Sequence, residues 1–205
     1  GLTNEYDGDA YFIRDGKVAE VPCFEDIEKL NFDGIGELEA AVTSGGLSTM
    51  PWSFAGKIKL LENKTLRYLG HWEQMLAYRQ LGLFQEEKIN FNDLSISPRE
   101  FYHHLLEPNL LKDSPKDICI MRTEAIGFLD GKSQTKRVEC IEKYNEKTGF
   151  LAMEMWTGFH ASMVMQHIAS SKIPVGAHPV EKALSGTDFY NYSKARGYNI
   201  HISSC

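Results

Sequence analysis

The stretch Tyr11-Phe-Ile-Arg-Asp-Gly-Lys-Val-Ala-Glu-Val21 has the pattern of a β-hairpin. Apolar and β-branched residues flank Asp15-Gly16, and an Asp-Gly pair supplies the positive φ angles that a two-residue turn requires. The same pattern recurs where Ala125–Leu129 and Arg137–Ile141 flank Asp130-Gly131. Both stretches therefore predict antiparallel pairing of neighbouring strands.

Outward from these hairpins, short apolar runs predict further strands at Leu38–Thr43, Thr65–Leu69, Asp117–Arg122, Phe150–Met155 and Asn199–Ile202. Helical periodicity predicts helices over His71–Leu81, Pro98–Leu106, Gly158–Ser171 and Thr187–Arg196. Ser97 is expected to cap the second of these helices and Thr157 the third. The least patterned stretch, Glu86–Pro98, is expected to be a surface loop. This order of elements predicts an α+β fold with a mixed, largely antiparallel sheet and helices mainly on one face.

The composition is that of a globular protein with a real core. The chain has 205 residues, of which 42% are hydrophobic and 24% charged, enough for one large domain or two small ones. No apolar run approaches the roughly 20 residues that cross a bilayer, so we expect a soluble, cytoplasmic protein without a membrane partner. The net charge is −6 and the basic residues are scattered, which argues against nucleic acid as a partner.

Common signatures of cofactor, metal and nucleophile sites are missing or out of context. The segment Gly34-Ile-Gly-Glu-Leu-Glu39 begins like a dinucleotide fingerprint, but it precedes a strand and ends on a charge that would face the pyrophosphate. The seven histidines lack the spacing of a metal-binding pair, so we expect no metal. The four cysteines contain no C-x-x-C pair and are interpreted as reduced thiols. Ser44 lacks the surroundings of a hydrolase nucleophile.

Two polar segments remain as candidates for binding. Thr43, Ser44 and Gly45 follow an apolar strand, where hydroxyls and backbone amides often hold a polar ligand; a plain polar turn explains them equally well. Arg67 lies in a strand-like run that leads into a helix. A guanidinium there can bind a carboxylate with two parallel hydrogen bonds, although an ordinary salt bridge is an equally good interpretation.

These two segments carry a resemblance to a known family. E-L-E-A-A-V-T-S-G-G-L-S-T at Glu37–Thr49 and K-T-L-R-Y-L-G-H at Lys64–His71 resemble, in this order, the paired substrate-domain signatures of the saccharopine dehydrogenase family. Later segments are similar to further landmarks of that family, so the resemblance covers most of the chain: Tyr144–Thr148, Thr157–Ala161, and Gly176–Pro179 with Glu181. The chain departs from the family pattern at His160, where Pro is common, and at Leu69, where Pro or Gln is common.

The resemblance implies an enzyme of two domains. An N-terminal Rossmann domain would bind NAD or NADP, and a second domain, like the catalytic fold of glyceraldehyde-3-phosphate dehydrogenase, would bind an amino-acid substrate and form a homodimer. Residues 1–205 resemble this second domain, and Gly1 at the first position suggests a separately cloned piece. Without the Rossmann domain the chain is expected to be inactive.

The implied reaction is the oxidation of the secondary amine of saccharopine, in lysine metabolism, by hydride transfer to the nicotinamide. Two alternatives stay open: a lysine 6-dehydrogenase, which acts on a primary amine, and a non-catalytic dimerisation or metabolite-sensing module. The resemblance places Arg67 on a substrate carboxylate with Tyr68 beside it, and Thr43, Ser44 and Gly45 opposite the nicotinamide.

Three further expectations concern the rest of the site. Thr157 and Gly158, at an expected helix N-terminus, would add an edge that favours anions. His71 and Lys64 are weak candidates for the catalytic acid or base, because they can titrate or hold charge near Arg67. The cofactor itself is expected to be bound mostly by the absent Rossmann domain.

Overall fold

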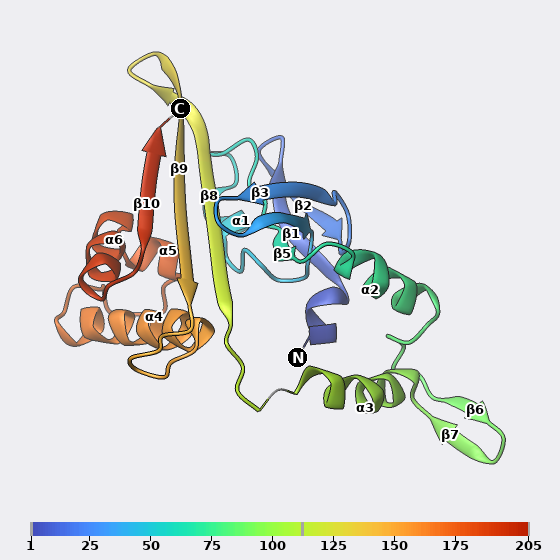
Figure 1. Cartoon of the computed structure of the whole chain (residues 1–205). Coiled ribbons are helices and arrows are strands. Elements are labelled where there is room, and N and C mark those ends of the chain that lie inside the picture. The colour runs from blue at the N-terminus through green and yellow to red at the C-terminus, as the bar shows by residue number, and fades with distance from the viewer. Residues whose placement is uncertain (1, 112, 205) are drawn as a thin grey trace. The chain divides into compact units, whose positions relative to one another are not determined.

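The computed structural model describes residues 2–111 and 113–204 and divides into two compact units, Gly1–Leu111 and Lys112–Cys205 (Figure 1). Both units combine antiparallel sheets with helices, which confirms the predicted α+β class. The β structure is divided among four small sheets, and every pairing among the described strands is antiparallel.

The first unit begins with a short 3-10 helix, η1, at Leu2–Tyr6. Its strands form a β1–β2 hairpin, a β3-β4-β5 sheet and a β6–β7 hairpin. The elements that follow η1 are β1 Asp9–Arg14, β2 Lys17–Pro22, β3 Glu28–Phe32, β4 Gly36–Ala41, α1 Met50–Phe54, β5 Thr65–Arg67, α2 His71–Gln80, β6 Ile89–Phe91, β7 Leu94–Ile96 and α3 Pro98–Leu110.

The predicted first hairpin is confirmed. Arg14 pairs with Lys17, and the two residues between them have φ angles of 49° at Asp15 and 78° at Gly16. Positive φ at both central positions is the geometry that Asp-Gly favours in tight hairpins. The second hairpin has the same form, since Leu129 pairs with Lys132 across Asp130-Gly131.

The core of the first unit forms around η1 and α2. Tyr6 and Trp72 are fully buried and pack edge to face, with ring centroids 5.2 Å apart. Met75 from α2 and Tyr102 from α3 also belong to this cluster, so η1 lies within the packed core. The Trp72 indole donates to the main-chain oxygen of Glu39 at 3.1 Å, which ties α2 to β4.

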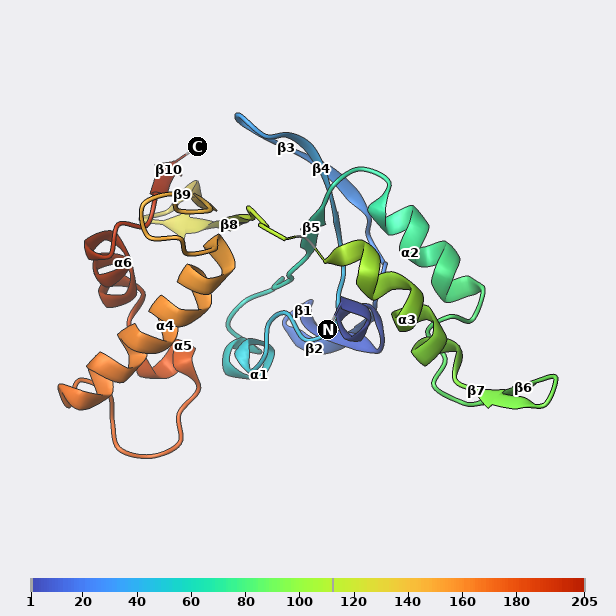
Figure 2. The ribbon, with the colours of Figure 1, turned by 60° about the horizontal axis from the view of Figure 1, so that its bottom comes forward.

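The second unit is one three-stranded sheet with helices on one of its faces (Figure 2). The strand order is β10-β9-β8, which leaves β8 at an edge. The elements in chain order are β8 Ile118–Leu129, β9 Lys132–Lys143, α4 Ala152–Ala169, α5 Val180–Ala183, α6 Gly186–Ala195 and β10 Ile200–Ser204.

Two predictions about α4 are wrong. The segment Phe150–Met155 is not a strand, because the helix begins at Ala152, and Thr157 lies inside that helix and does not cap it. The cap is a distant residue: the Asp117 carboxylate accepts from the backbone N–H of Ala152 at 2.7 Å and of Met153 at 2.9 Å. A helix start that depends on a side chain 35 residues away has no local signature at the predicted N-cap.

The other predicted helices agree with the structure. Ser97 caps α3 as expected, and its hydroxyl accepts from the Glu100 N–H at 3.4 Å. The expected loop at Glu86–Pro98 contains the small exposed β6–β7 hairpin, whose turn includes Asn92 at a φ of 54°.

Candidate functional site

The pairing of β4 with β5 brings the two predicted binding segments together. Glu39 lies opposite Arg67, and Ala41 lies opposite Thr65. Just beyond β4, the hydroxyls of Thr43 and Thr65 are hydrogen-bonded at 2.6 Å. The polar turn after β4 and the Arg67 segment are therefore neighbours in the first unit.

The Arg67 guanidinium is held from three sides. Its Nη2 forms an ion pair with Glu5 Oε2 at 3.1 Å, and its Nε donates to the Tyr6 hydroxyl at 2.9 Å. Its Nη1 donates to the main-chain oxygen of Leu66 at 2.9 Å, and the group lies over the rings of Tyr6 and Trp72. The side chain is 28% exposed, whereas that of Glu5 is 53% exposed. Arg67 thus already binds a carboxylate, supplied by the chain itself and open to solvent.

The Tyr6 hydroxyl connects Arg67 to His71. It accepts from Arg67 Nε, and it lies 2.8 Å from His71 Nε2. Tyr6 is fully buried, so its single hydroxyl proton needs an acceptor, and the His71 nitrogen provides it. His71 is then neutral, with Nε2 as acceptor and its proton on Nδ1.

The electrostatic environment agrees with this arrangement. Burial, and then the positive charge of Arg67, lower the pKa of His71 below its usual 6.5, against a smaller opposing effect of Glu39. Burial raises the pKa of Tyr6 above its usual 10.0, although Arg67 opposes that shift. Both groups are therefore neutral at physiological pH.

The turn after β4 is held against η1. The Ser44 hydroxyl donates to the main-chain oxygen of Asn4 at 3.0 Å, and the Ser44 N–H donates to that of Glu5 at 2.9 Å. Gly45 is exposed and has a φ of 81°, a conformation that favours glycine. A Cβ at the next residue, Gly46, would lie 2.1 Å from the amide nitrogen of Asn63.

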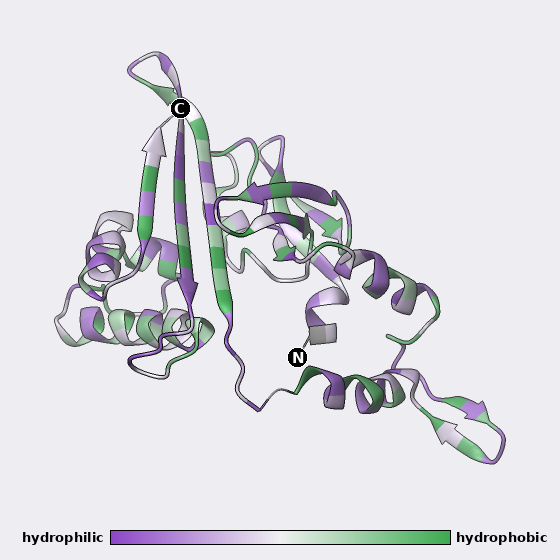
Figure 3. Ribbon diagram, viewed as in Figure 1, coloured by the Kyte–Doolittle hydropathy of each residue, from purple (hydrophilic) through white to green (hydrophobic). Residues whose placement is uncertain are grey.

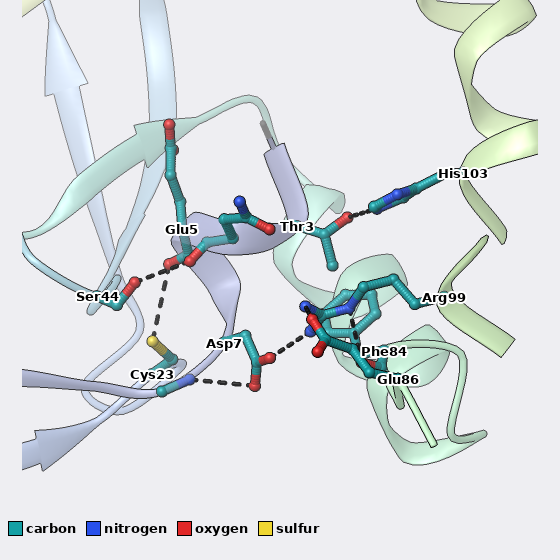
Figure 4. A network of polar contacts seen from close by, with 11 residues as sticks. Thr3, Glu5, Asp7, Cys23, Ser44, Phe84, Glu86, Arg99 and His103 are labelled. Carbon is teal, nitrogen blue, oxygen red and sulfur yellow. Dashed lines mark hydrogen bonds and ion pairs between the residues drawn. The ribbon is translucent and has the colours of Figure 1, made fainter. Parts of the chain in front are cut away.

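Residues Thr3 to Asp7 are clamped between this turn and α3 (Figure 4). Thr3 is hydrogen-bonded to His103 at 2.8 Å. Asp7 forms an ion pair with Arg99, a buried side chain that also pairs with Glu86. Because each partner is distant in sequence, no local pattern identified this network, and Glu5 and Tyr6 were missed as members of the site.

The remaining predicted residues have different surroundings. Tyr68 is 67% exposed beside Arg67. Lys64 is only 13% exposed and forms an ion pair with Glu28 at 3.0 Å, so its charge is already compensated. In the second unit, Thr157 and Gly158 lie within α4, where the Thr157 hydroxyl donates to Met153 O at 2.7 Å. The expectation of a helix N-terminus at these two residues is therefore wrong.

The glycine pair at the start of β4 serves a turn. Phe32 pairs with Gly36 across the β3–β4 hairpin, and Gly34 and Gly36 have φ angles of 73° and 99°. No helix follows them, so they do not form a phosphate-binding turn. Over residues 2–111 and 113–204, no group of three or more His, Cys, Asp or Glu side chains is arranged to hold a metal ion. No helix in these same ranges is long and apolar enough to cross a membrane.

The sequence resemblance implied a domain with an α+β fold and with an arginine that binds a carboxylate beside a polar turn at the end of a strand. The structure has this class of domain. Residues 1–193 match the family model of the saccharopine dehydrogenase C-terminal domain. The chain therefore belongs to this dehydrogenase family, and the suspected resemblance is confirmed.

A solved structure supports the fold. The chain is similar to apo histidine-tagged saccharopine dehydrogenase (L-Glu forming) from Saccharomyces cerevisiae, with a TM-score of 0.72 and 12% sequence identity. The match covers 100% of this chain and 60% of the yeast chain, so the present chain corresponds to only part of that protein. At this level of identity the likeness shows the fold alone.

Proposed function

We propose that this chain is the substrate-binding domain of an NAD(P)-dependent oxidoreductase that acts on the CH–NH group of an amino acid, with saccharopine as the substrate. The observation that carries the proposal is the Arg67–Glu5 ion pair. The pair supports the view that the Arg67 guanidinium is positioned to bind a carboxylate. The exposed carboxylate of Glu5 lies in the place that a substrate carboxylate would take.

The neighbouring residues support specific roles in this proposal. Ser44 would offer its hydroxyl to the substrate, and Gly45 its exposed backbone. Tyr6 would keep the guanidinium in position, because its hydroxyl accepts from Arg67 Nε. NAD or NADP, held by a separate Rossmann domain, would accept the hydride. His71 remains the candidate proton acceptor, and the proton would reach its Nε2 through the Tyr6 hydroxyl.

The experiment that tests this proposal has a binding arm and a turnover arm. Calorimetry of saccharopine with the 205-residue chain should give a saturable signal that Arg67→Ala weakens at least about tenfold, because a charge-assisted contact is lost. Arg67→Lys should recover only part of the affinity, since an ammonium lacks the planar fork. Arg137→Ala is the matched control, because it breaks the comparable exposed pair with Glu124 in the second unit.

The turnover arm uses the chain joined to its Rossmann domain. Reduction of NAD or NADP on addition of saccharopine, impaired by Arg67→Ala mainly through a higher KM, is the expected result. Turnover with lysine and none with saccharopine would indicate a lysine 6-dehydrogenase. Absence of binding and turnover with both would reject the enzymatic proposal and leave the non-catalytic module.

We further propose that the chain forms a homodimer through β8. This strand lies at the edge of its sheet, and apolar bands run along it (Figure 3). Ile126 and Phe128 are 78% and 82% exposed, and they share a face because side chains alternate along a strand. A long edge strand with exposed apolar side chains favours pairing with a second copy.

A further inference from the structure

The second unit contains a small pocket that the proposed function does not use. It has a volume of about 190 Å³ and lies where the end of β9, the first turns of α4 and the chain after α6 meet. Its lining includes Glu142, Asn145, Phe150, Phe159, Arg196 and Tyr198. The pocket is smaller than the roughly 300–1,000 Å³ of sites for drug-sized ligands, which excludes a dinucleotide and favours a much smaller ligand.

Arg196 places a fixed positive charge in the lining. Its Nη2 donates to Ser162 Oγ at 2.9 Å and to Gln166 Oε1 at 3.1 Å, both on α4. The guanidinium lies over the Phe159 ring, 5.5 Å from its centroid. Within residues 113–204 its Nε and Nη1 have no hydrogen-bond or ion-pair partner. The Nε–H bond points to the edge shared with Nη2, so Nη1 is the group that can donate a charge-assisted hydrogen bond to a ligand carboxylate.

Glu142 places a negative charge in the same lining. Its Oε1 accepts from the Asn199 N–H at 2.6 Å, which holds the carboxylate in position. Among the described residues, no group donates to its Oε2, and Glu142 does not pair with Arg196 although both line the pocket. Two opposite charges in one small pocket, each held by separate contacts, leave room for a ligand that carries both signs.

The apolar part of the lining is aromatic. Phe159 packs edge to face with Phe150 and with Tyr198, with ring centroids 6.3 Å and 6.1 Å apart. The Tyr198 hydroxyl donates to Met155 O at 2.9 Å, so the ring is fixed. Burial, together with the nearby Cys140 and Glu142, raises the pKa of Tyr198 to about 12, and the ring stays neutral. These rings offer contact to an aliphatic side chain.

We propose that this pocket binds a free α-amino acid with an aliphatic side chain. The carboxylate contacts Arg196, the ammonium contacts Glu142 Oε2, and the side chain lies against the Phe150 and Phe159 rings. The site lies entirely in the second unit and is independent of Arg67 in the first. It takes a second amino acid in addition to the proposed substrate.

The test is a titration of the 205-residue chain with L-leucine, followed by amide chemical shifts. Saturable shifts should appear at Thr148, Phe159 and Gly197, which border the pocket. Two analogues dissect the contacts: 4-methylpentanoate lacks the ammonium, and 3-methylbutylamine lacks the carboxylate. Each should bind at least about tenfold more weakly than L-leucine, because one charge-assisted contact is lost.

Two variants test which residue contacts each charged group of the ligand. Arg196→Gln should weaken L-leucine and 4-methylpentanoate but leave 3-methylbutylamine unchanged. Glu142→Gln, which keeps an oxygen for Asn199, should weaken L-leucine and the amine but leave the acid unchanged. Lys194→Gln is the matched control: it removes an exposed charge from the last turn of α6, two residues before Arg196, and should have no effect. Thermal unfolding of each variant checks that the fold is retained.

The outcomes separate this site from the one at Arg67. Loss of the L-leucine shifts in Arg67→Ala, with no effect of the two pocket variants, would overturn the proposal by assigning the binding to the first unit. No saturable shift with L-leucine at millimolar concentration would overturn it as well. Selective effects of both pocket variants would support it whether or not saccharopine binds.

Discussion

The Tyr6 hydroxyl has one proton, and this proton determines the state of His71. A protonated His71 would have no acceptor to offer Tyr6, and it would place a second positive charge near Arg67. The folded structure therefore stabilises the neutral form of the His71 imidazole. This preference should be measurable in the pH dependence of the free energy of unfolding.

We expect the free energy of unfolding to decrease as the pH falls below about 6.5, because His71 takes up a proton in the unfolded chain at a pH where the folded chain does not. When folding lowers a pKa, the resulting stability is fully present at pH values above the pKa of the unfolded chain. It is lost as the pH falls toward the lower pKa of the folded chain. Urea unfolding between pH 8 and pH 5 should show a weaker dependence in His71→Gln, whose amide oxygen can still accept from Tyr6. The exposed His104→Gln is the control, and equal pH slopes in all three proteins would contradict the prediction.

The Asn63 side chain limits what residue 46 can be, since φ at Gly46 is not positive and its backbone would accept alanine. We expect Gly46→Ala to destabilise the first unit by about 0.5–1.5 kcal/mol, because the Asn63 amide must leave its present rotamer to make room for the new Cβ. Asn63→Ala should restore most of that loss, as a double-mutant cycle from urea unfolding can show. Additive effects of the two substitutions would mean that the contact is not the cause.

At the scale of elements, the start of α4 depends on Asp117. Its carboxylate accepts from two of the first N–H groups of the helix, and Glu154 Oε2 accepts from the Leu151 N–H at 2.8 Å. A carboxylate at this end also interacts favourably with the helix dipole. Residue 117 therefore caps the N–H groups of Ala152 and Met153, while Glu154 caps that of Leu151 from within the first turn.

We expect Asp117→Ala to destabilise the second unit by about 0.5–2 kcal/mol, the range measured for loss of an N-cap. Hydrogen exchange should become faster at the amides of Ala152 and Met153, which lose their acceptor. Asp117→Asn should retain much of the protection, because its amide oxygen can still accept. Unchanged exchange in the alanine variant would show that another group caps the helix.

Local patterns determined which elements could be predicted from the sequence. The two Asp-Gly hairpins, the Ser97 cap and α2 are specified within about ten residues, and all were confirmed. The predicted start of α4 was wrong because the helix is capped by Asp117, which is distant in the sequence. For the site, sequence segments identified Arg67 and the turn after β4, but Glu5 and Tyr6 reach Arg67 only through the folded core.

At the scale of the whole molecule, the proposed homodimer can be tested directly by measuring the mass of the protein in solution. We expect light scattering to give a dimer mass for the chain and a monomer mass for Ile126→Lys or Phe128→Lys, because a charge on the apolar face of β8 opposes association. Thr123→Lys is the matched control, since it adds the same charge to the opposite face of the strand. A dimer that persists in both lysine variants would assign the interface to another surface.

The link from Asp117 to α4 also limits how this protein can be recombined with its relatives. A chimera with a crossover between β8 and α4 would join a strand from one parent to a helix from another. If the donor of the strand lacked a carboxylate at the position of Asp117, the grafted helix would lose its start even though every residue of the helix was retained. Crossover points that keep residues 117 to 153 together preserve this contact, and those that divide them do not.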